Sequence, residues 1–441
     1  MQTCDWGLLS LAGDYIENYF GKFVSDDGSI LYRGPETGQF GRMLAVVAQY
    51  INNGGDAGIA LKYRSRIDGI ANLLLSLRRK AQALPASDPA HGMIAGWSEA
   101  DSALNPDPSR YMQPYFGNST EAARGFHDIG KVWEQLGRDR GDAALAEWGN
   151  SLVSEAASLE RDIQHAIARS ILTNTDPICL PAIAGAKEPW HIAVARDPLD
   201  PLHRGYRSYM EMLFSGDLTR EHVETIVRYR AAHRDSILGL PTAYGYDSRE
   251  VAGFLTYGQA YGLLQHDFIR EFLLTLYSMR AHHYTRGTWT APETRKLDRV
   301  TDAAPYCVPA QLVVPMLTRW MLAFEDPRSE TLWLAKGAPR EWLEDGGNIS
   351  AARVPTRWGR IDFTIASHLA DRRIETTLLL PAKPFGAVLK LRLRVPEGRR
   401  LSRVTLNGEA WPAFDAASET IAVPANLTGR VNIVAIYTVE R

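Results

Sequence analysis

The sequence has few cysteines and almost no net charge. Its three cysteines, Cys4, Cys179 and Cys307, are far apart and form no CxxC pair. A disulfide framework or a thiolate zinc site is therefore not expected. The formal net charge of −2 gives no electrostatic basis for binding nucleic acid or a membrane surface. We expect neither as a partner, and the oligomeric state cannot be predicted from these features.

Long apolar runs and common cofactor motifs are also missing. No run approaches the roughly 18 apolar residues that span a bilayer, and the N-terminus has no signal-peptide features. We expect a cytoplasmic protein on the sequence as given, or a periplasmic or secreted one if a signal peptide was removed. There is no HExxH, GxGxxG or P-loop motif, and the adjacent His282 and His283 would point in different directions on a helix. We predict no metal and no cofactor.

What remains is the composition of an ordinary globular protein, with 45% hydrophobic, 10% aromatic and 23% charged residues. A chain of 441 residues is long for one domain, so we expect two. Apolar periodicity predicts about ten helices in the first three quarters of the chain. They cover residues 6–22, 39–52, 57–83, 119–137, 141–170, 204–214, 218–234, 249–264, 267–284 and 307–324.

The connections between these helices alternate in length. Those after the second, fourth, sixth and eighth helices are short, and those after the odd-numbered helices are long. Helices joined by short turns run antiparallel, so every long loop should lie at the same end of the helical bundle. The long loops cover residues 23–38, 84–118, 171–203, 235–248 and 285–306. Five long loops on one face predict a binding surface.

After about residue 329 the pattern changes to short segments typical of strands. These segments are 357–367, 372–380, 387–395, 401–406, 419–423 and 430–439. Asn407-Gly408 is a tight-turn signal, and charged residues alternate with leucine along 389–394. We predict a C-terminal antiparallel β-sandwich over residues 329–441.

Two of the long loops combine acids with aromatic side chains, which is typical of sugar-binding sites. Glycosidases need two carboxyl groups across the scissile bond, and Glu99 and Glu293 lie on loops of the same predicted face. Asp101 competes with Glu99 for the same role. We name as candidate substrate-binding residues aromatic and polar side chains of the long loops and of the start of the last helix: Trp97, Tyr111, Asn118, Trp190, His191, Tyr244, Tyr246, Arg286, Trp289, Tyr306 and Gln311.

This layout resembles the six-hairpin glycosidases, which include glucoamylases, trehalases and bacterial α-L-rhamnosidases. Three segments carry the resemblance: Trp97-Ser98-Glu99-Ala100-Asp101, Gly287-Thr288-Trp289-Thr290-Ala291-Pro292-Glu293, and Val354-Pro355-Thr356-Arg357-Trp358-Gly359-Arg360-Ile361. The resemblance implies an α/α toroid of about ten to twelve helices over residues 1–328, followed by the β-sandwich. It also implies a glycoside hydrolase in which Glu99 protonates the leaving oxygen and Glu293 activates water, with inversion.

Two alternatives stay open. Polysaccharide lyases of the α/α-toroid type use His or Tyr as base and Asn and Arg to neutralise a uronate carboxylate. The long loops offer Asn118, His191, Tyr244, Tyr246 and Arg286 for those roles. A carbohydrate-binding protein without activity is the other alternative.

Overall fold

The computed structural model describes the whole chain except residues 31–35, 243–248, 298–301 and 440–441. It divides into two compact units. The helical unit comprises Ser10–Ile51 and Gly55–Val314, and the β unit comprises Met1–Leu9, Asn52–Gly54 and Pro315–Arg441. In the described ranges, no helix combines the length and apolarity needed to cross a membrane. The predicted domain boundary at residue 328 stays a prediction.

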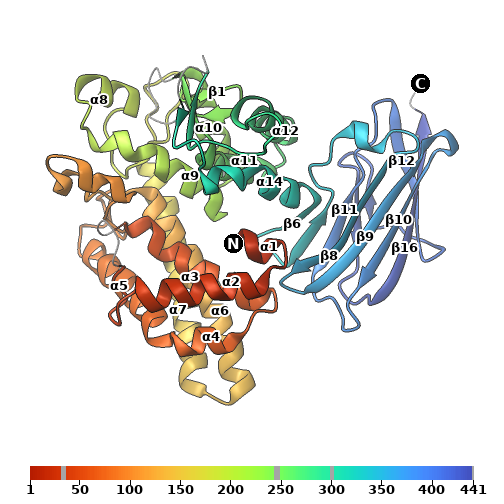
Figure 1. Ribbon diagram of the computed structural model, residues 1–441, viewed down its shortest axis with the longest axis horizontal. Helices are drawn as coiled ribbons and strands as arrows, with labels where there is room; N and C mark the ends of the chain where they lie inside the picture. The colour runs from red at the N-terminus through yellow and green to blue at the C-terminus, as the bar shows by residue number, and fades with distance from the viewer. Residues whose placement is uncertain (31–35, 243–248, 298–301, 440–441) are drawn as a thin grey trace. The chain divides into compact units, whose positions relative to one another are not determined.

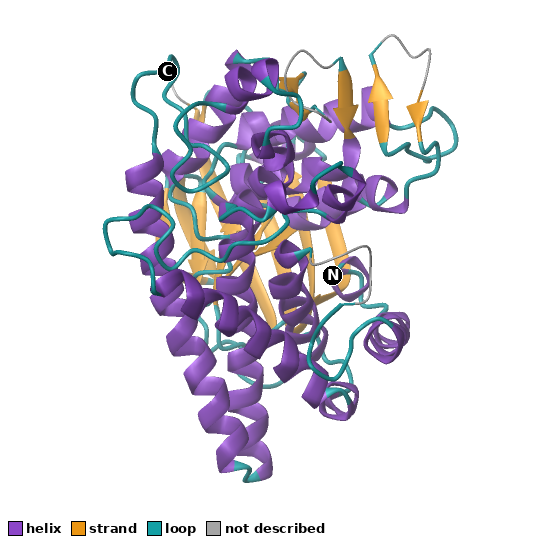
Figure 2. Ribbon diagram, turned by 90° about the vertical axis from the view of Figure 1, so that its left-hand side faces the viewer, coloured by secondary structure: helices purple, strands orange, loops and turns teal. Residues whose placement is uncertain are grey.

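The helical unit follows the predicted order of helices closely (Figures 1 and 2). Its helices are α2 (Leu9–Lys22), α3 (Thr37–Asn52), α4 (Ala57–Lys62), α5 (Arg64–Gln82), α6 (Phe116–Arg140), α7 (Ala143–Ser170), α8 (Trp190–Arg196), α9 (Gly205–Ser215), α10 (Arg220–Ala232), α11 (Thr256–Gln265), α12 (Ile269–Ser278) and α13 (Val308–Gln311). Helix α14 (Val313–Leu322) begins in this unit and continues into the β unit. Gly141, with a φ of 68°, ends α6, and the Asp142 side chain caps α7.

One predicted helix is wrong in its first half. Residues 249–255 are not α-helical: Glu250–Ala252 forms strand β3, which pairs with β4 (Thr294–Lys296), and Gly253–Leu255 forms a 3-10 turn. Strand β4 also pairs with β5 (Asp302–Ala303), giving a small three-stranded sheet. The partner strand lies over 40 residues away along the chain, so local periodicity does not detect it.

Four central helices pack side by side in the order α3, α6, α9 and α11, and each contacts the next. Gly41 of α3 has no room for a Cβ atom because the Glu121 backbone of α6 would lie 2.2 Å away. Ser208 of α9 accepts a hydrogen bond from the Gly117 amide of α6. Gly258 of α11 packs closely against Met210 of α9, since an added Cβ atom would lie 2.2 Å from the Met210 carbonyl oxygen. Each of these central helices begins where a long loop ends.

The β unit is a sandwich of two sheets whose inner faces share one apolar core. One sheet has the order β13-β12-β16-β10-β9-β8 and the other β14-β15-β11-β7-β6. The strands are β6 (Ala323–Glu325), β7 (Thr331–Leu334), β8 (Asn348–Thr356), β9 (Gly359–His368), β10 (Arg373–Leu380), β11 (Val388–Arg392), β12 (Arg399–Leu406), β13 (Glu409–Ala410), β14 (Phe414–Asp415), β15 (Thr420–Val423) and β16 (Gly429–Val439).

Two details refine the predicted sandwich. The sheets are not wholly antiparallel, because β7 and β11 pair in parallel. Their parallel pairing is possible because the long excursion through β8, β9 and β10 in the other sheet separates them in the chain. The expected tight turn is confirmed: Asn407 and Gly408 have φ values of 52° and 91° and join β12 to β13.

Candidate functional site

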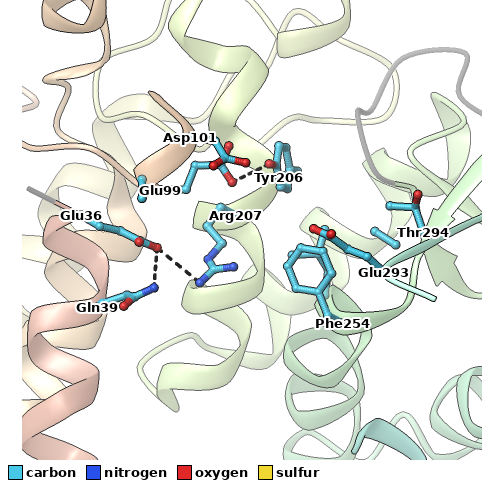
Figure 3. A pocket seen from close by; sticks show the side chains of 12 residues that line it. Glu36, Gln39, Glu99, Asp101, Tyr206, Arg207, Phe254, Glu293 and Thr294 are labelled. Carbon is cyan, nitrogen blue, oxygen red and sulfur yellow. Dashed lines mark hydrogen bonds and ion pairs between the residues drawn. The ribbon is translucent and has the colours of Figure 1, made fainter. Parts of the chain in front are cut away.

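One pocket in the helical unit lies where the long loops lead into the central helices. It is lined by Glu36, Gln39, Glu99, Ala100, Asp101, Tyr206, Arg207, Ala252, Phe254, Leu255, Glu293 and Thr294. These residues come from every long loop or from the first turns that follow them. Figure 3 shows Glu293 and Phe254 across the pocket from Glu36 and Gln39, with Glu99, Asp101 and Tyr206 along a third side.

Glu99 is held firmly at the wall of the pocket. It precedes a 3-10 turn (Ala100–Leu104), and the residue is only 7% exposed. The Arg204 guanidinium donates to Oε1, and the Tyr206 hydroxyl donates to Oε2 at 2.5 Å. Burial and the charge of Glu99 both raise the pKa of Tyr206, so Tyr206 stays a protonated donor. Both donors suit an anionic carboxylate.

Glu36 is a second buried carboxylate of the pocket. Its Oε1 accepts hydrogen bonds from Gln39 Nε2 at 2.7 Å and from Arg207 Nη2 at 3.4 Å. Burial raises the pKa of Glu36, although Arg207 opposes the shift. Burial works against the charge of Arg207, but Glu211, Glu36 and Glu99 outweigh it, raise the pKa of Arg207 and keep it a cation.

A buried carboxyl group lies behind Arg207. The Glu211 carboxylate packs against the first turns of α3 and α6, where Gly38 and Gly117 leave space: a Cβ atom there would lie 2.7 Å and 2.5 Å from Oε2. Burial raises the pKa of Glu211 to about 8, against the opposing charges of Arg207 and Arg42. Burial therefore outweighs these cations and the two helix N-termini, and Glu211 holds a proton near pH 7.

Glu293 is positioned by the small sheet. Its backbone N–H donates to the Ala304 carbonyl at 3.0 Å, and its carbonyl accepts from the Gly253 N–H at 3.2 Å. The buried His283 ring lies 2.8 Å from the Pro292 carbonyl and fills the space where a Cβ atom on Gly253 would sit. His283 therefore anchors the segment that carries Glu293, which agrees with a structural role for this histidine.

No family model and no curated protein matches the sequence. Two solved structures show some similarity to this chain. A structure described as "Glycoside hydrolase" shares 13% identity and a TM-score of 0.42, over 96% of this chain and 68% of that one. An alpha-L-rhamnosidase from Dictyoglumus thermophilum shares 8% identity and a TM-score of 0.46, over 90% of this chain and 39% of that one.

This chain spans well under half the length of the rhamnosidase structure. At these identities and TM-scores, roles for individual residues have to come from the geometry of this pocket.

Of the predicted catalytic residues, Glu99, Asp101 and Glu293 all line the pocket. Three of the predicted binding residues near them are buried and support the loop instead. The Trp97 indole N–H donates to the Pro108 carbonyl at 3.1 Å, and the Tyr111 hydroxyl donates to the Leu199 carbonyl at 3.0 Å. Asn118 Nδ2 donates to the Gly96 carbonyl at 3.1 Å. None of the three is among the pocket residues.

Trp190 and His191 also lie elsewhere. Trp190 is buried, and the His191 ring stacks on His233 at 4.0 Å and bonds to the Tyr229 hydroxyl at 2.9 Å. Burial lowers the pKa of His191 to about 4, so this ring is neutral near pH 7. These contacts fix the third long loop on α10.

The remaining predicted binding residues do not line the pocket. Trp289 is 59% exposed and Tyr306 is 75% exposed; Arg286 is exposed, and Gln311 is half-buried at the end of α13. None belongs to the pocket as described. Tyr244 and Tyr246 lie outside the described residues.

The pocket also contains residues that the sequence analysis missed: Glu36, Gln39, Tyr206, Arg207 and Phe254. They stand at the first turn of a helix or just before it, not in the middle of a long loop. The alternation of loop lengths could have identified these residues, because it places the first turns of those helices at the same end of the bundle as the long loops.

Proposed function

We propose that this chain is a glycoside hydrolase whose central helices close into an α/α toroid around the pocket. One observation carries the proposal: Glu99, Asp101 and Glu293, on loops nearly two hundred residues apart, line a single pocket. Carboxyl groups on different sides of a pocket meet the requirement of glycosidic hydrolysis for an acid and a base.

Glu293 is proposed as the base that activates water, with inversion at the anomeric carbon. The acid comes from the segment Glu99–Asp101. The family resemblance implies Glu99, but Arg204 and Tyr206 both donate to its oxygens, which suits an anion. We therefore favour Asp101 as the proton donor, with Glu99 as a fixed negative charge that stabilises an oxocarbenium-like transition state.

Phe254 is proposed as the apolar platform for the sugar. It lines the pocket next to Glu293, and the Arg207 guanidinium lies 5.9 Å from its ring centre. Aromatic faces pack on the C–H face of a sugar ring while carboxylates and amides bind its hydroxyls. Phe254 takes the role that the sequence analysis gave to Trp289.

The charge of the pocket argues against the lyase alternative. A lyase neutralises the carboxylate of a uronate, whereas this pocket is lined by Glu36, Glu99, Asp101 and Glu293. Arg207, the cation that lines it, already interacts with Glu36 and Glu211. A uronate would meet like charge, so a neutral sugar fits better.

The test compares Glu293→Gln with the parent on a panel of α- and β-linked aryl glycosides and oligosaccharides. We expect kcat/KM to fall by about 10²–10⁴-fold, because the base is lost. Glu188→Gln is the matched control: this glutamate is on another long loop, paired with Arg196 and outside the pocket. Equal turnover by Glu293→Gln and the parent would contradict the assignment.

A second pair of variants separates the two candidate acids. If Asp101 is the acid, Asp101→Asn should retain activity on dinitrophenyl glycosides, whose leaving group needs no proton, and lose it on poor leaving groups. Glu99→Gln should lose activity on both. Products that absorb in the far ultraviolet would instead identify a lyase, and sugar binding without turnover by the parent would identify a binding protein.

A further inference from the structure

Three polar residues of the pocket have no part in the hydrolysis proposed above: Glu36, Gln39 and Arg207. Glu36 directly precedes α3, Gln39 lies in the first turn of α3, and Arg207 lies in the first turn of α9. Figure 3 shows Glu36 and Gln39 across the pocket from Glu293 and Phe254. We call Glu36, Gln39 and Arg207 together the polar wall.

The polar wall combines hydrogen-bond donors with acceptors. An ionised Glu36 carboxylate only accepts, the Gln39 amide both donates and accepts, and the Arg207 guanidinium only donates. Gln39 Nε2 donates to Glu36 Oε1 at 2.7 Å, and Arg207 Nη2 lies 3.4 Å from the same oxygen. These contacts hold the three groups side by side, which is the arrangement that recognises hydroxyl groups.

The polar wall retains hydrogen-bonding capacity for a ligand. Within the described ranges, both hydrogen bonds to the Glu36 side chain reach Oε1, whereas a carboxylate accepts about four. Arg207 lies 3.4 Å from Glu36 and 3.5 Å from Glu211, both longer than the roughly 2.7–2.9 Å of a strong charge-assisted bond. Glu36 is only 6% exposed, so a ligand that fills the pocket without bonding to it leaves a buried polar group unpaired.

Arg207 connects the polar wall to the proposed platform for the sugar, because its guanidinium lies 5.9 Å from the ring centre of Phe254. A sugar packed on Phe254 with its anomeric carbon toward Glu293 turns the opposite edge of its ring to the polar wall. Adjacent hydroxyls on that edge are close enough for one carboxylate to accept from both, while Gln39 and Arg207 donate to their oxygens.

We infer that the polar wall sets the specificity of the pocket by binding two adjacent hydroxyls remote from the anomeric carbon, the 3- and 4-hydroxyls of a hexopyranose. The substrate class is then a neutral sugar that is free at both positions. A deoxy, O-methyl or glycosyl substitution at either position excludes a sugar from this class. The inference rests on the proposed function, because Glu293 and Phe254 orient the sugar.

The test is a cycle between enzyme and substrate. The substrates are the aryl hexopyranoside that the parent hydrolyses fastest and its 3-deoxy and 4-deoxy analogues. Each deoxy change should lower kcat/KM of the parent by about 10²-fold or more, because it leaves polar groups of the wall unpaired. In Glu36→Gln each should cost no more than about tenfold, since the contact is already weakened. Gln39→Met should show the same reduced cost for at least one analogue.

Gln39→Met keeps the test independent of the folding of Glu36→Gln, because Gln39 is half-buried and methionine has a similar length. Its matched control is Gln135→Met in α6: Gln135 also donates to a carboxylate, that of Asp139 at 2.7 Å, but is exposed and outside the pocket. Gln135→Met and Glu188→Gln should show the full deoxy penalty of the parent. The 2-deoxy analogue is the control in the substrate and should show no coupling to Glu36→Gln.

The same cycle can be measured in Kd without hydrolysis, by calorimetric titration of the parent and both variants with methyl hexopyranosides and their deoxy analogues. Coupled binding without turnover by the parent would overturn the proposed function and support the polar wall as a sugar-binding site. Deoxy penalties that are equal in the parent, Glu36→Gln and Gln39→Met would overturn the polar wall alone, since a residue that only supports the fold gives that result. A parent that neither hydrolyses nor binds any sugar of the panel would overturn both.

Discussion

Buried arginines serve different partners in the two units. In the helical unit they pair with carboxylates: Arg204 with Glu99, Arg78 with Glu155, and Arg230 with Asp235. In the β unit, Arg319 donates to the carbonyls of Asp5, Ala323 and Pro355, with the Glu325 carboxylate further away at 3.8 Å, and Arg394 donates to the carbonyl of Ala338.

The difference follows from what each unit has to satisfy. Burying an ion pair costs desolvation free energy, and apolar side chains in its place often give a protein that is equally stable. A buried ion pair near a pocket therefore suggests that its charges serve the function of the pocket. Carbonyl groups at the ends of strands and helices need donors, and a guanidinium supplies several at once. Breaking an arginine contact should therefore affect activity and stability together in the helical unit, and stability alone in the β unit.

The largest effect is expected for Arg204→Leu. Glu99 would stay buried beside Tyr206 without its cation, at a cost of about 3–5 kcal/mol in the free energy of unfolding. Activity should fall at least about 10²-fold because the fixed charge of the site is disturbed. Urea unfolding and kcat/KM of the folded protein measure both. Full activity of this variant would show that the Arg204–Glu99 ion pair is not needed for catalysis.

Glu211 gives a comparison that depends on pH. Its folded pKa is raised above the unfolded value, so its contribution to stability is fully present below about pH 4.5 and is lost as the pH rises to about 8. Glu211→Gln stays neutral throughout. It should match the parent near pH 4.5 and exceed its stability by up to about 4 kcal/mol near pH 8.5. Parallel stability curves would show that Glu211 does not carry this linkage.

Much of the helical architecture could be predicted because it is local. Apolar side chains at helical spacing identify α3 or α7 without knowledge of any other part of the chain. The alternation of long and short connections then brings Glu99 and Glu293 to one end, and both line the pocket. Strand β3 was missed because its partner β4 is distant in sequence.

The binding residues were harder to predict, since aromatic and polar side chains look alike whether they face a ligand or a neighbouring loop. Trp97 and Asn118 satisfy carbonyls within their own loop, and His191 stacks on α10. Glu36 and Arg207, by contrast, are charged residues at helix starts, where composition alone gives solvated surface as the default. Only burial and pairing in three dimensions distinguish them.

Arg319→Leu tests the β unit. Three carbonyls lose a donor, so the free energy of unfolding should fall by about 3 kcal/mol, while kcat of the folded protein stays unchanged because the pocket is lined by the helical unit. The exposed Arg400, changed to Leu, is the matched control and should differ from the parent by less than about 0.5 kcal/mol. A loss of kcat in folded Arg319→Leu would contradict the expectation that buried arginines of the β unit affect stability alone.

The smallest effect is expected for Gly408→Ala in the β12–β13 turn. Nothing lies within 4 Å of an added Cβ atom there, so the change costs only the strain of a φ of 91°. We expect a loss of about 1 kcal/mol, seen as a lower Tm with unchanged kcat/KM. Gly141→Ala is the counterpart in the helical unit, because it too has a positive φ and open space. Equal losses at both turns would show that backbone strain is independent of the unit, and that the contrast between the units lies in their buried charges.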